Sequence, residues 1–182
     1  VLTGTALDVE VAAGRAVFDA DFSRYEADYR VRLPDLSALA AAGGVAVAGG
    51  ATLQGTTGGA TAAPWARGHL AADGLGIEGR PWRDLRLDYR LDDLVAGPRG
   101  RLDARARSPW AAVTLGADIG PADGGRLAVR NLAAEALGTR LTGTITVDAA
   151  RALVDGRLEA TVPDLTAWSA AAGIPLAGGL GA

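Results

Sequence analysis

The sequence predicts an all-β protein built on one mostly antiparallel sheet, and three observations lead to this class. Apolar and polar residues alternate at every second position through long stretches, which is the side-chain period of a β-strand. One side of each stretch is apolar and the other is charged, as in a sheet with one solvated face. The connections are short and rich in turn residues, so most neighbouring strands are expected to be antiparallel.

The clearest alternation spans 84–92, where leucines and a tyrosine alternate with arginines and aspartates. The same pattern occurs at 24–33, 140–147 and 154–162, and in shorter form at 7–11, 15–22 and 101–107. We expect roughly a dozen strands, separated by turn signals. Examples of these turn signals are Ala13-Gly14, Gly58-Gly59, Gly97-Pro98, Asp123-Gly124-Gly125 and Asp155-Gly156.

Two similar segments predict the only helices, which are short and lie near 36–42 and 165–172. Each begins with Pro-Asp-Leu, at Pro34 and at Pro163. The aspartate can cap the first turn, and Gly44 or Gly173 can end the helix.

These segments belong to an internal repeat. Residues 34–51 align with 163–180 at an offset of 129, and ten of these eighteen positions are identical. Upstream, the Leu-Thr-Gly-Thr at 2–5 returns at 141–144. We therefore expect 1–182 to be a single segment of a longer repetitive β array, with approximate repeats 2–53 and 141–182.

Composition argues against several functional classes. All 18 basic residues are arginine, against 21 acids, so the chain lacks the basic excess of a nucleic-acid binder. It has no cysteine and one histidine, which leaves no thiol chemistry and no His-rich metal site. We expect a non-enzymatic protein without cofactor, metal or nucleic-acid partner. The charged stretch 80–107 is expected to form a solvated face whose arginines and aspartates pair across strands, and His69 an exposed strand position.

Four segments together resemble the repeats of the TamB family, which comprises AsmA-like periplasmic proteins anchored in the inner membrane of Gram-negative bacteria. They are Leu-Thr-Gly-Thr-Ile-Thr-Val-Asp at 141–148, Asp-Gly-Arg-Leu-Glu-Ala at 155–160, Pro-Asp-Leu at 163–165 and Pro-Leu-Ala-Gly-Gly at 175–179. The resemblance implies a long sheet curled into a U-shaped trough, or β-taco, with an apolar inner surface. It also implies a function in moving phospholipids across the periplasm for outer-membrane biogenesis, and a partnership with an outer-membrane assembly barrel protein. The family's membrane anchor would lie outside this segment.

On this basis we expect an apolar groove that conducts phospholipid acyl chains between the inner and outer membranes. The candidate lipid-lining residues are Phe18, Phe22, Tyr25, Tyr29, Val31, Leu85, Leu87, Tyr89, Leu91, Leu102, Leu141, Ile145, Val147, Leu158 and Val162. The alternative is a structural or adhesive β-solenoid or β-sandwich whose apolar face is a closed core. The residues alone favour the closed core, because half-apolar sheets normally pack against another layer, whereas the resemblance favours the open trough.

Overall fold

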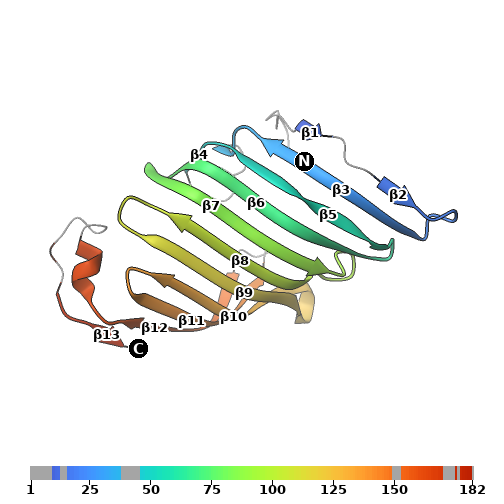
Figure 1. The fold of residues 1–182 in the computed structure, drawn as a ribbon. Coiled ribbons are helices and arrows are strands. Elements are labelled where there is room, and N and C mark those ends of the chain that lie inside the picture. The colour runs from blue at the N-terminus through green and yellow to red at the C-terminus, as the bar shows by residue number, and fades with distance from the viewer. Residues whose placement is uncertain are drawn as a thin grey trace.

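The computed structural model describes residues 10–12, 16–37, 46–148, 153–169, 175 and 177–181. They form one large β-sheet with two single-turn 3-10 helices (Figure 1). The elements are β1 (Glu10–Ala12), β2 (Ala16–Phe18), β3 (Arg24–Leu33), β4 (Val47–Ala48), β5 (Ala51–Ala60), β6 (Ala63–Ile77), β7 (Arg80–Asp92), β8 (Arg99–Arg107), β9 (Ala112–Ala122), η1 (Asp123–Gly125), β10 (Arg126–Ala136), β11 (Thr139–Asp148), β12 (Leu153–Val162), η2 (Leu165–Trp168) and β13 (Leu180–Gly181).

Consecutive strands are neighbours in the sheet from β5 to β13, and every pairing is antiparallel. The sheet begins at β1 and β2, which both pair with β3, and ends at β12 and β13. It does not close on itself, because no pairing joins these two ends among the described residues. The predicted all-β, mostly antiparallel trough is therefore confirmed.

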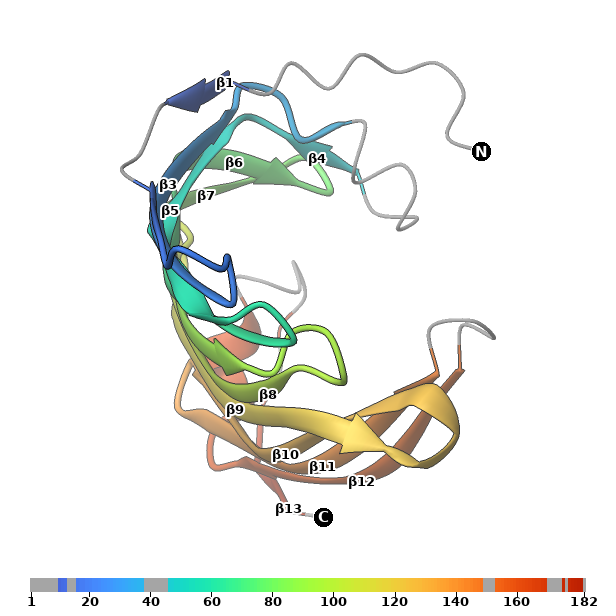
Figure 2. The same ribbon diagram turned by 90° about the vertical axis from the view of Figure 1, so that its right-hand side faces the viewer.

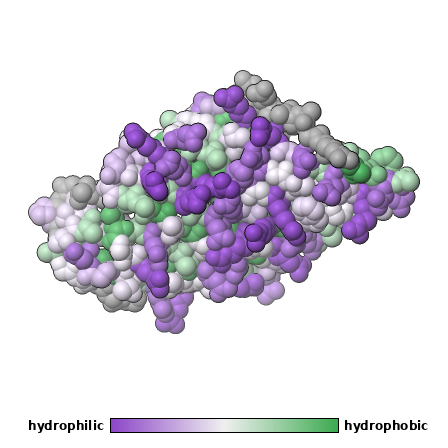
Figure 3. Space-filling view, in the orientation of Figure 1, coloured by the Kyte–Doolittle hydropathy of each residue, from purple (hydrophilic) through white to green (hydrophobic). Residues whose placement is uncertain are grey.

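The sheet bends into an arc that runs from β1 and β3 to β12 and encloses an open concave side (Figure 2). Hydrophilic side chains spread over the convex face (Figure 3), and the apolar members of each alternating strand lie on the concave side. In the part of the chain that the structure describes, the sheet is a single layer, with no second sheet facing it.

Bulges and tight turns accentuate the twist. Asp84 in β7 and Asn131 in β10 have φ values of 51° and 50°, and each lies where the register of its strand shifts. Such bulges add local twist to a sheet. The β6–β7 and β10–β11 hairpins turn at Glu78-Gly79 and Leu137-Gly138, where both central residues have positive φ, as a type I′ turn requires.

The two Pro-Asp-Leu segments share one backbone contact. The amide of Leu36 donates to the carbonyl of Gly49 (2.8 Å), and the amide of Leu165 donates to that of Gly178 (2.7 Å), again at an offset of 129. At the second segment Asp164 accepts from the amide of Thr166 (2.8 Å), as predicted for the cap, and the helical turn η2 follows. Residues 38–45 and 170–174, which contain most of the first predicted helix and the end of the second, lie outside the described residues.

Several local predictions were wrong. The stretch 15–22 is not one strand: β2 ends at Phe18, and a turn follows in which the amide of Phe22 donates to the carbonyl of Asp19 (3.0 Å). Gly58-Gly59 and Asp155-Gly156 lie inside β5 and β12 instead of forming turns. The predicted strand at 7–11 falls largely outside the described residues, and the turn signal Ala13-Gly14 lies outside them too. Gly97-Pro98 and Asp123-Gly124-Gly125 do connect strands.

Candidate functional site

The strand register shows which predicted lining residues share the concave face. Val31, Leu87 and Leu141 lie in one row across the sheet, while Leu91 and Ile145 lie in another. The remaining strand candidates fall on the same face by alternation and pairing; they are Phe18, Tyr25, Tyr29, Leu85, Tyr89, Leu102, Val147, Leu158 and Val162. Phe22 is the exception, because it lies in the turn between β2 and β3.

One row of this face is apolar from end to end, and we call it the central apolar row. It crosses nine strands by direct pairing and consists of Val31, Leu53, Leu70, Leu87, Ala104, Leu115, Ala134, Leu141 and Ala160. At a strand spacing of about 4.8 Å it is roughly 38 Å long. No charged or hydrogen-bonding side chain interrupts it.

The concave face is accessible rather than sealed. Every member of the central apolar row is partly exposed, and Leu115 retains 37% of its accessible surface. Among the described residues no large side chain is fully buried, and five of the seven buried apolar residues are alanine. Leu158, near the β12 end of the face, is 50% exposed. A half-apolar sheet therefore presents a continuous apolar surface to an occupant.

Polar atoms on the concave face bond to one another. The hydroxyls of Tyr29 and Tyr89 hydrogen-bond across two intervening strands. The hydroxyl of Tyr25 bonds that of Thr57 (3.1 Å), which donates to the carbonyl of Trp65 (2.8 Å). Because these groups are already paired, they place little demand on an apolar ligand for hydrogen bonds.

The Tyr29–Tyr89 contact depends on two glycines between the tyrosines. Register places Gly55 and Gly68 in the row that joins the two rings, and a Cβ at Gly68 would lie 2.7 Å from the Tyr89 hydroxyl oxygen. The rings therefore lie over bare backbone, as aromatic residues that cover glycines in sheets do. Burial and the Tyr29 hydrogen bond raise the pKa of Tyr89 well above its ordinary value, so its hydroxyl stays protonated at neutral pH.

Both Pro-Asp-Leu segments contact the apolar face at the same rim. They follow β3 and β12, which run in the same direction because an even number of antiparallel steps separates them. Leu36 packs against a small cluster that includes Ala51, Ala72 and Leu75. At the other segment the indole nitrogen of Trp168 donates to the hydroxyl of Thr139 (2.8 Å).

Aromatic side chains gather where β2 meets β3. The rings of Phe18 and Phe22 have centroids 5.6 Å apart, and Phe18 stacks on Tyr25 at 6.1 Å. Phe18 and Phe22 remain 52% and 67% exposed. Phe22 thus extends the apolar surface from a turn, not from the strand that the alternation predicted.

The convex face carries the charges, and they pair across strands in part as predicted. Directly opposite one another on β7 and β8 are Arg86 and Arg105, Asp88 and Asp103, and Arg90 and Arg101. Some ion pairs form along single strands, such as Arg86 to Asp88 and Arg101 to Asp103, each at 2.9 Å. Others join neighbouring strands: Arg107 of β8 pairs with Asp84 of β7 (3.5 Å), and Arg101 with Asp118 of β9 (3.3 Å). Pairing across β7 and β8 is confirmed at Arg107–Asp84. The like-charged residues that face each other elsewhere on these strands were not predicted, because alternation within a strand leaves the register between strands undetermined.

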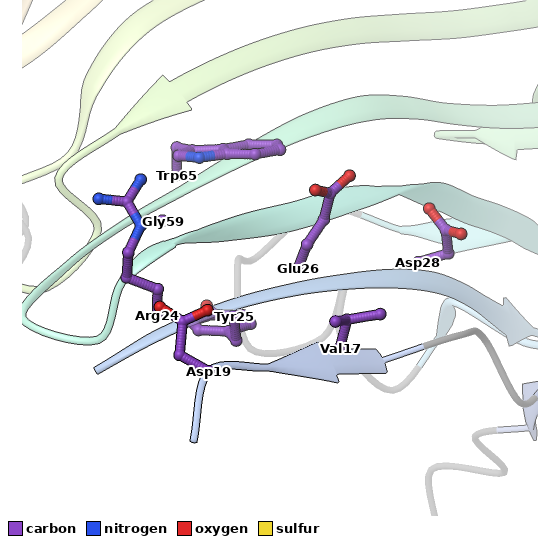
Figure 4. A pocket seen from close by; sticks show the side chains of 8 residues that line it. All are labelled: Val17, Asp19, Arg24, Tyr25, Glu26, Asp28, Gly59 and Trp65. Carbon is purple, nitrogen blue, oxygen red and sulfur yellow. The ribbon is translucent and has the colours of Figure 1, made fainter. Parts of the chain in front are cut away.

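A hollow of about 500 Å³ opens beside β2 and β3 (Figure 4). Arg24, Glu26 and Asp28 line it together with the indole of Trp65. It has no grouping of three or more potential metal-ligating side chains, and neither does any other part of the described chain. His69 lies on the charged face, as predicted, but is half-buried with its Nε2 2.9 Å from the Gln54 side-chain nitrogen.

A scan against known families and searches of curated proteins and of solved structures find no match to this chain. None of the described helices is long and apolar enough to cross a membrane. Six members of the central apolar row are not among the predicted lining residues, namely Leu53, Leu70, Ala104, Leu115, Ala134 and Ala160. Ala104 and Ala160 do lie on the apolar side of stretches that were predicted as strands, 101–107 and 154–162. A signal was present at Leu70, which alternates with His69, and at Leu115, which alternates with Thr114.

Proposed function

We propose that the concave face conducts phospholipid acyl chains, as one segment of a TamB-like protein that links the inner and outer membranes across the periplasm. The observation that carries the proposal is the central apolar row, which is continuous across nine strands and accessible at every position. The charged convex face would be turned to water, and phospholipid head groups would remain at the open side of the trough.

The mechanism is passive sliding. Each CH₂ that leaves water for an apolar wall contributes about 0.8 kcal/mol. A wall of leucine, valine and alanine offers similar contacts at successive positions, so an acyl chain gains burial without a deep local minimum. The hydrogen-bonded pairs Tyr29–Tyr89 and Tyr25–Thr57 support this, because no unpaired hydroxyl there would anchor a lipid. No residue is assigned a catalytic role, and the proposed protein is not an enzyme.

The half-exposed row favours this conduit over a structural or adhesive solenoid, in which the same face would be a closed core. Periplasmic location, the inner-membrane anchor and an outer-membrane assembly barrel partner enter the proposal through the family resemblance. Lipid conduction by the segment itself can be tested without them.

The test places a benzophenone amino acid at Leu115 on the concave face and, separately, at its neighbour Thr114 on the convex face. After incubation with a radiolabelled phospholipid and irradiation, we expect a lipid adduct at Leu115 at least about fivefold above that at Thr114, because period two puts the neighbours on opposite faces. Equal labelling of both positions, or none at Leu115 in a folded chain, would contradict the proposal.

A further inference from the structure

A row of three arginines crosses the convex face, away from the proposed lipid surface. Arg67 on β6 lies directly opposite Arg90 on β7, which lies directly opposite Arg101 on β8. Side chains at directly opposed positions have Cβ atoms about 5 Å apart, and like charges placed there destabilise a sheet. The opposed arginines of this row therefore repel one another.

The neighbouring carboxylates leave two of the three arginines without an ion pair. Arg101 bonds Asp103 (2.9 Å) and Asp118 (3.3 Å). Asp88 is engaged by Arg86 through both of its oxygens. Within the described residues, neither Arg67 nor Arg90 contacts a carboxylate.

Two other acids lie nearby in the described chain, and neither forms an ion pair with Arg67 or Arg90. Asp28 accepts from the hydroxyl of Thr56 (2.9 Å), and Asp92 lies opposite Arg99 in the next row. The unneutralised charge of the row therefore resides on Arg67 and Arg90.

Arg67 is oriented by an aromatic ring. Its guanidinium carbon lies 5.0 Å from the ring centroid of Trp65, two residues earlier on the same face of β6. Stacking of this kind holds the planar guanidinium in one orientation, with its N–H groups directed along its edges. A hollow of about 460 Å³ lies at this point, lined by both unpaired arginines together with Arg101, His69, Asp88 and Asp103.

We propose that Arg67 and Arg90 form a binding site for a phosphate group, with Arg101 at its margin. A tetrahedral dianion has enough oxygens to accept from two guanidinium forks at once, whereas one fork already satisfies a carboxylate. A phosphate between the two side chains converts a repulsive cross-strand pair into two attractive contacts. The phosphate could come from a free phosphate ion or from a monoester on a lipid head group.

The test follows the indole N–H signal of Trp65 by NMR while inorganic phosphate is added to the full chain. We expect a shift that saturates as phosphate is added. The affinity for phosphate should be about tenfold or more lower in Arg90→Gln and in Arg67→Gln, because each substitution removes one charge-assisted contact. Arg32→Gln is the matched control, since Arg32 is an exposed arginine of β3 outside the row. Its affinity for phosphate should stay within about twofold of the unmodified chain.

Two further measurements identify the chemical nature of the ligand: titration with acetate and flotation with vesicles. The affinity for acetate, followed by the same Trp65 signal, should be at least about tenfold lower than the affinity for phosphate, because acetate lacks the oxygens to accept from a second guanidinium. Flotation with phosphatidylcholine vesicles, with and without phosphatidic acid, separates the sources. Vesicle binding that needs both phosphatidic acid and Arg90 assigns the site to a lipid head group. Binding of inorganic phosphate without binding to phosphatidic acid vesicles assigns the site to the free ion.

Non-saturable phosphate shifts, equal effects of the Arg90 and Arg32 substitutions, or equal affinity for acetate would overturn the proposal. The outcome is independent of lipid conduction, because the site and its control lie on the opposite face from Leu115.

Discussion

Replacing Leu141 with arginine tests whether the concave face is open. Leu141 lies in the central apolar row between Ala134 and Ala160, so a longer side chain has small neighbours on both sides. Complete burial of a leucine contributes about 1.5–3 kcal/mol, and a half-buried leucine therefore loses about 1 kcal/mol when it is replaced. On an open wall the arginine stem can lie along the surface with its guanidinium in water.

For a chain of this length, 1 kcal/mol corresponds to a fall in Tm of about 2–4 °C. A closed core predicts a different result, because an unpaired guanidinium in an apolar interior costs several kcal/mol. Tm would then fall by on the order of 10 °C, or the chain would not fold. Thermal unfolding followed by circular dichroism separates these two magnitudes.

The control is Thr142→Arg, which adds the same side chain one residue away on the convex face. Thr142 lies between Ala133 and Glu159, so the new guanidinium can approach a carboxylate. We expect a change in Tm within about 2 °C, as for other surface charges. If Leu141→Arg unfolds while Thr142→Arg stays folded, the hypothesis that the concave face is open would be refuted.

The same pair of variants tests conduction. Leu115 lies two strands from Leu141 along the central apolar row, at about 10 Å by strand spacing. A guanidinium at 141 should lower phospholipid adduct formation at a Leu115 benzophenone several-fold, while Thr142→Arg should leave it unchanged. A folded Leu141→Arg protein with undiminished lipid labelling would show that the row is not the lipid path.

Three further outcomes are expected. Because the folded-state pKa of Tyr89 lies above its unfolded value, the contribution of Tyr89 to stability should be constant below about pH 10 and be lost as the pH rises beyond it. Urea unfolding above about pH 10 should therefore show a smaller fall in stability for Tyr89→Phe than for the unmodified chain. Gly68→Ala should destabilise strongly, since its Cβ would lie 2.2 Å from the Gln54 carbonyl oxygen, whereas Gly74→Ala on the same strand meets nothing within 4 Å and should be nearly neutral by the same unfolding assay. Among the described residues β13 pairs only with the end of β12, which leaves 153–160 as an open edge. Sedimentation should therefore show concentration-dependent association that Leu158→Lys reduces, and a monomer at all concentrations would contradict this.

Most strands with regular alternation were predictable almost to the residue, although 84–92 omits the first four residues of β7, which begins at Arg80. The stretch 24–33 coincides with β3, and 154–162 differs from β12 by one residue. In these strands polar and apolar side chains of ordinary size fill alternate positions, so the pattern is visible without any knowledge of the neighbours.

β5 and β6 were not predicted as individual strands, because their apolar face contains glycines. Gly55 and Gly68 leave space that Tyr29 and Tyr89, distant in sequence, occupy from the flanking strands. That these glycines lie on the concave face is visible only when the two tyrosines and the two glycines are considered together, and not in the sequence of β5 or β6 alone. The arginine row escaped prediction for the same reason, since opposition of Arg67 and Arg90 is a property of register.

Small residues on the concave side connect the shape of the sheet to its proposed use. Side chains on the inside of a curved sheet converge, so the inner face favours alanine and glycine over bulkier residues. At Gly100, which has a φ of 156°, glycine is required for a different reason: a Cβ there would lie 1.8 Å from the backbone carbonyl oxygen of Arg90 on the neighbouring strand. The long arginines occupy the convex side, where neighbouring side chains diverge into water.

The same small residues prevent the sheet from burying a substantial core, since alanines account for most of its fully covered apolar positions. Stability must then depend largely on the backbone ladder and on cross-strand pairs such as Tyr29–Tyr89. A closed sandwich would need large residues meeting across two layers, whereas a lipid wall needs a shallow apolar surface that remains exposed. The distribution of small and large side chains in this chain matches the second requirement.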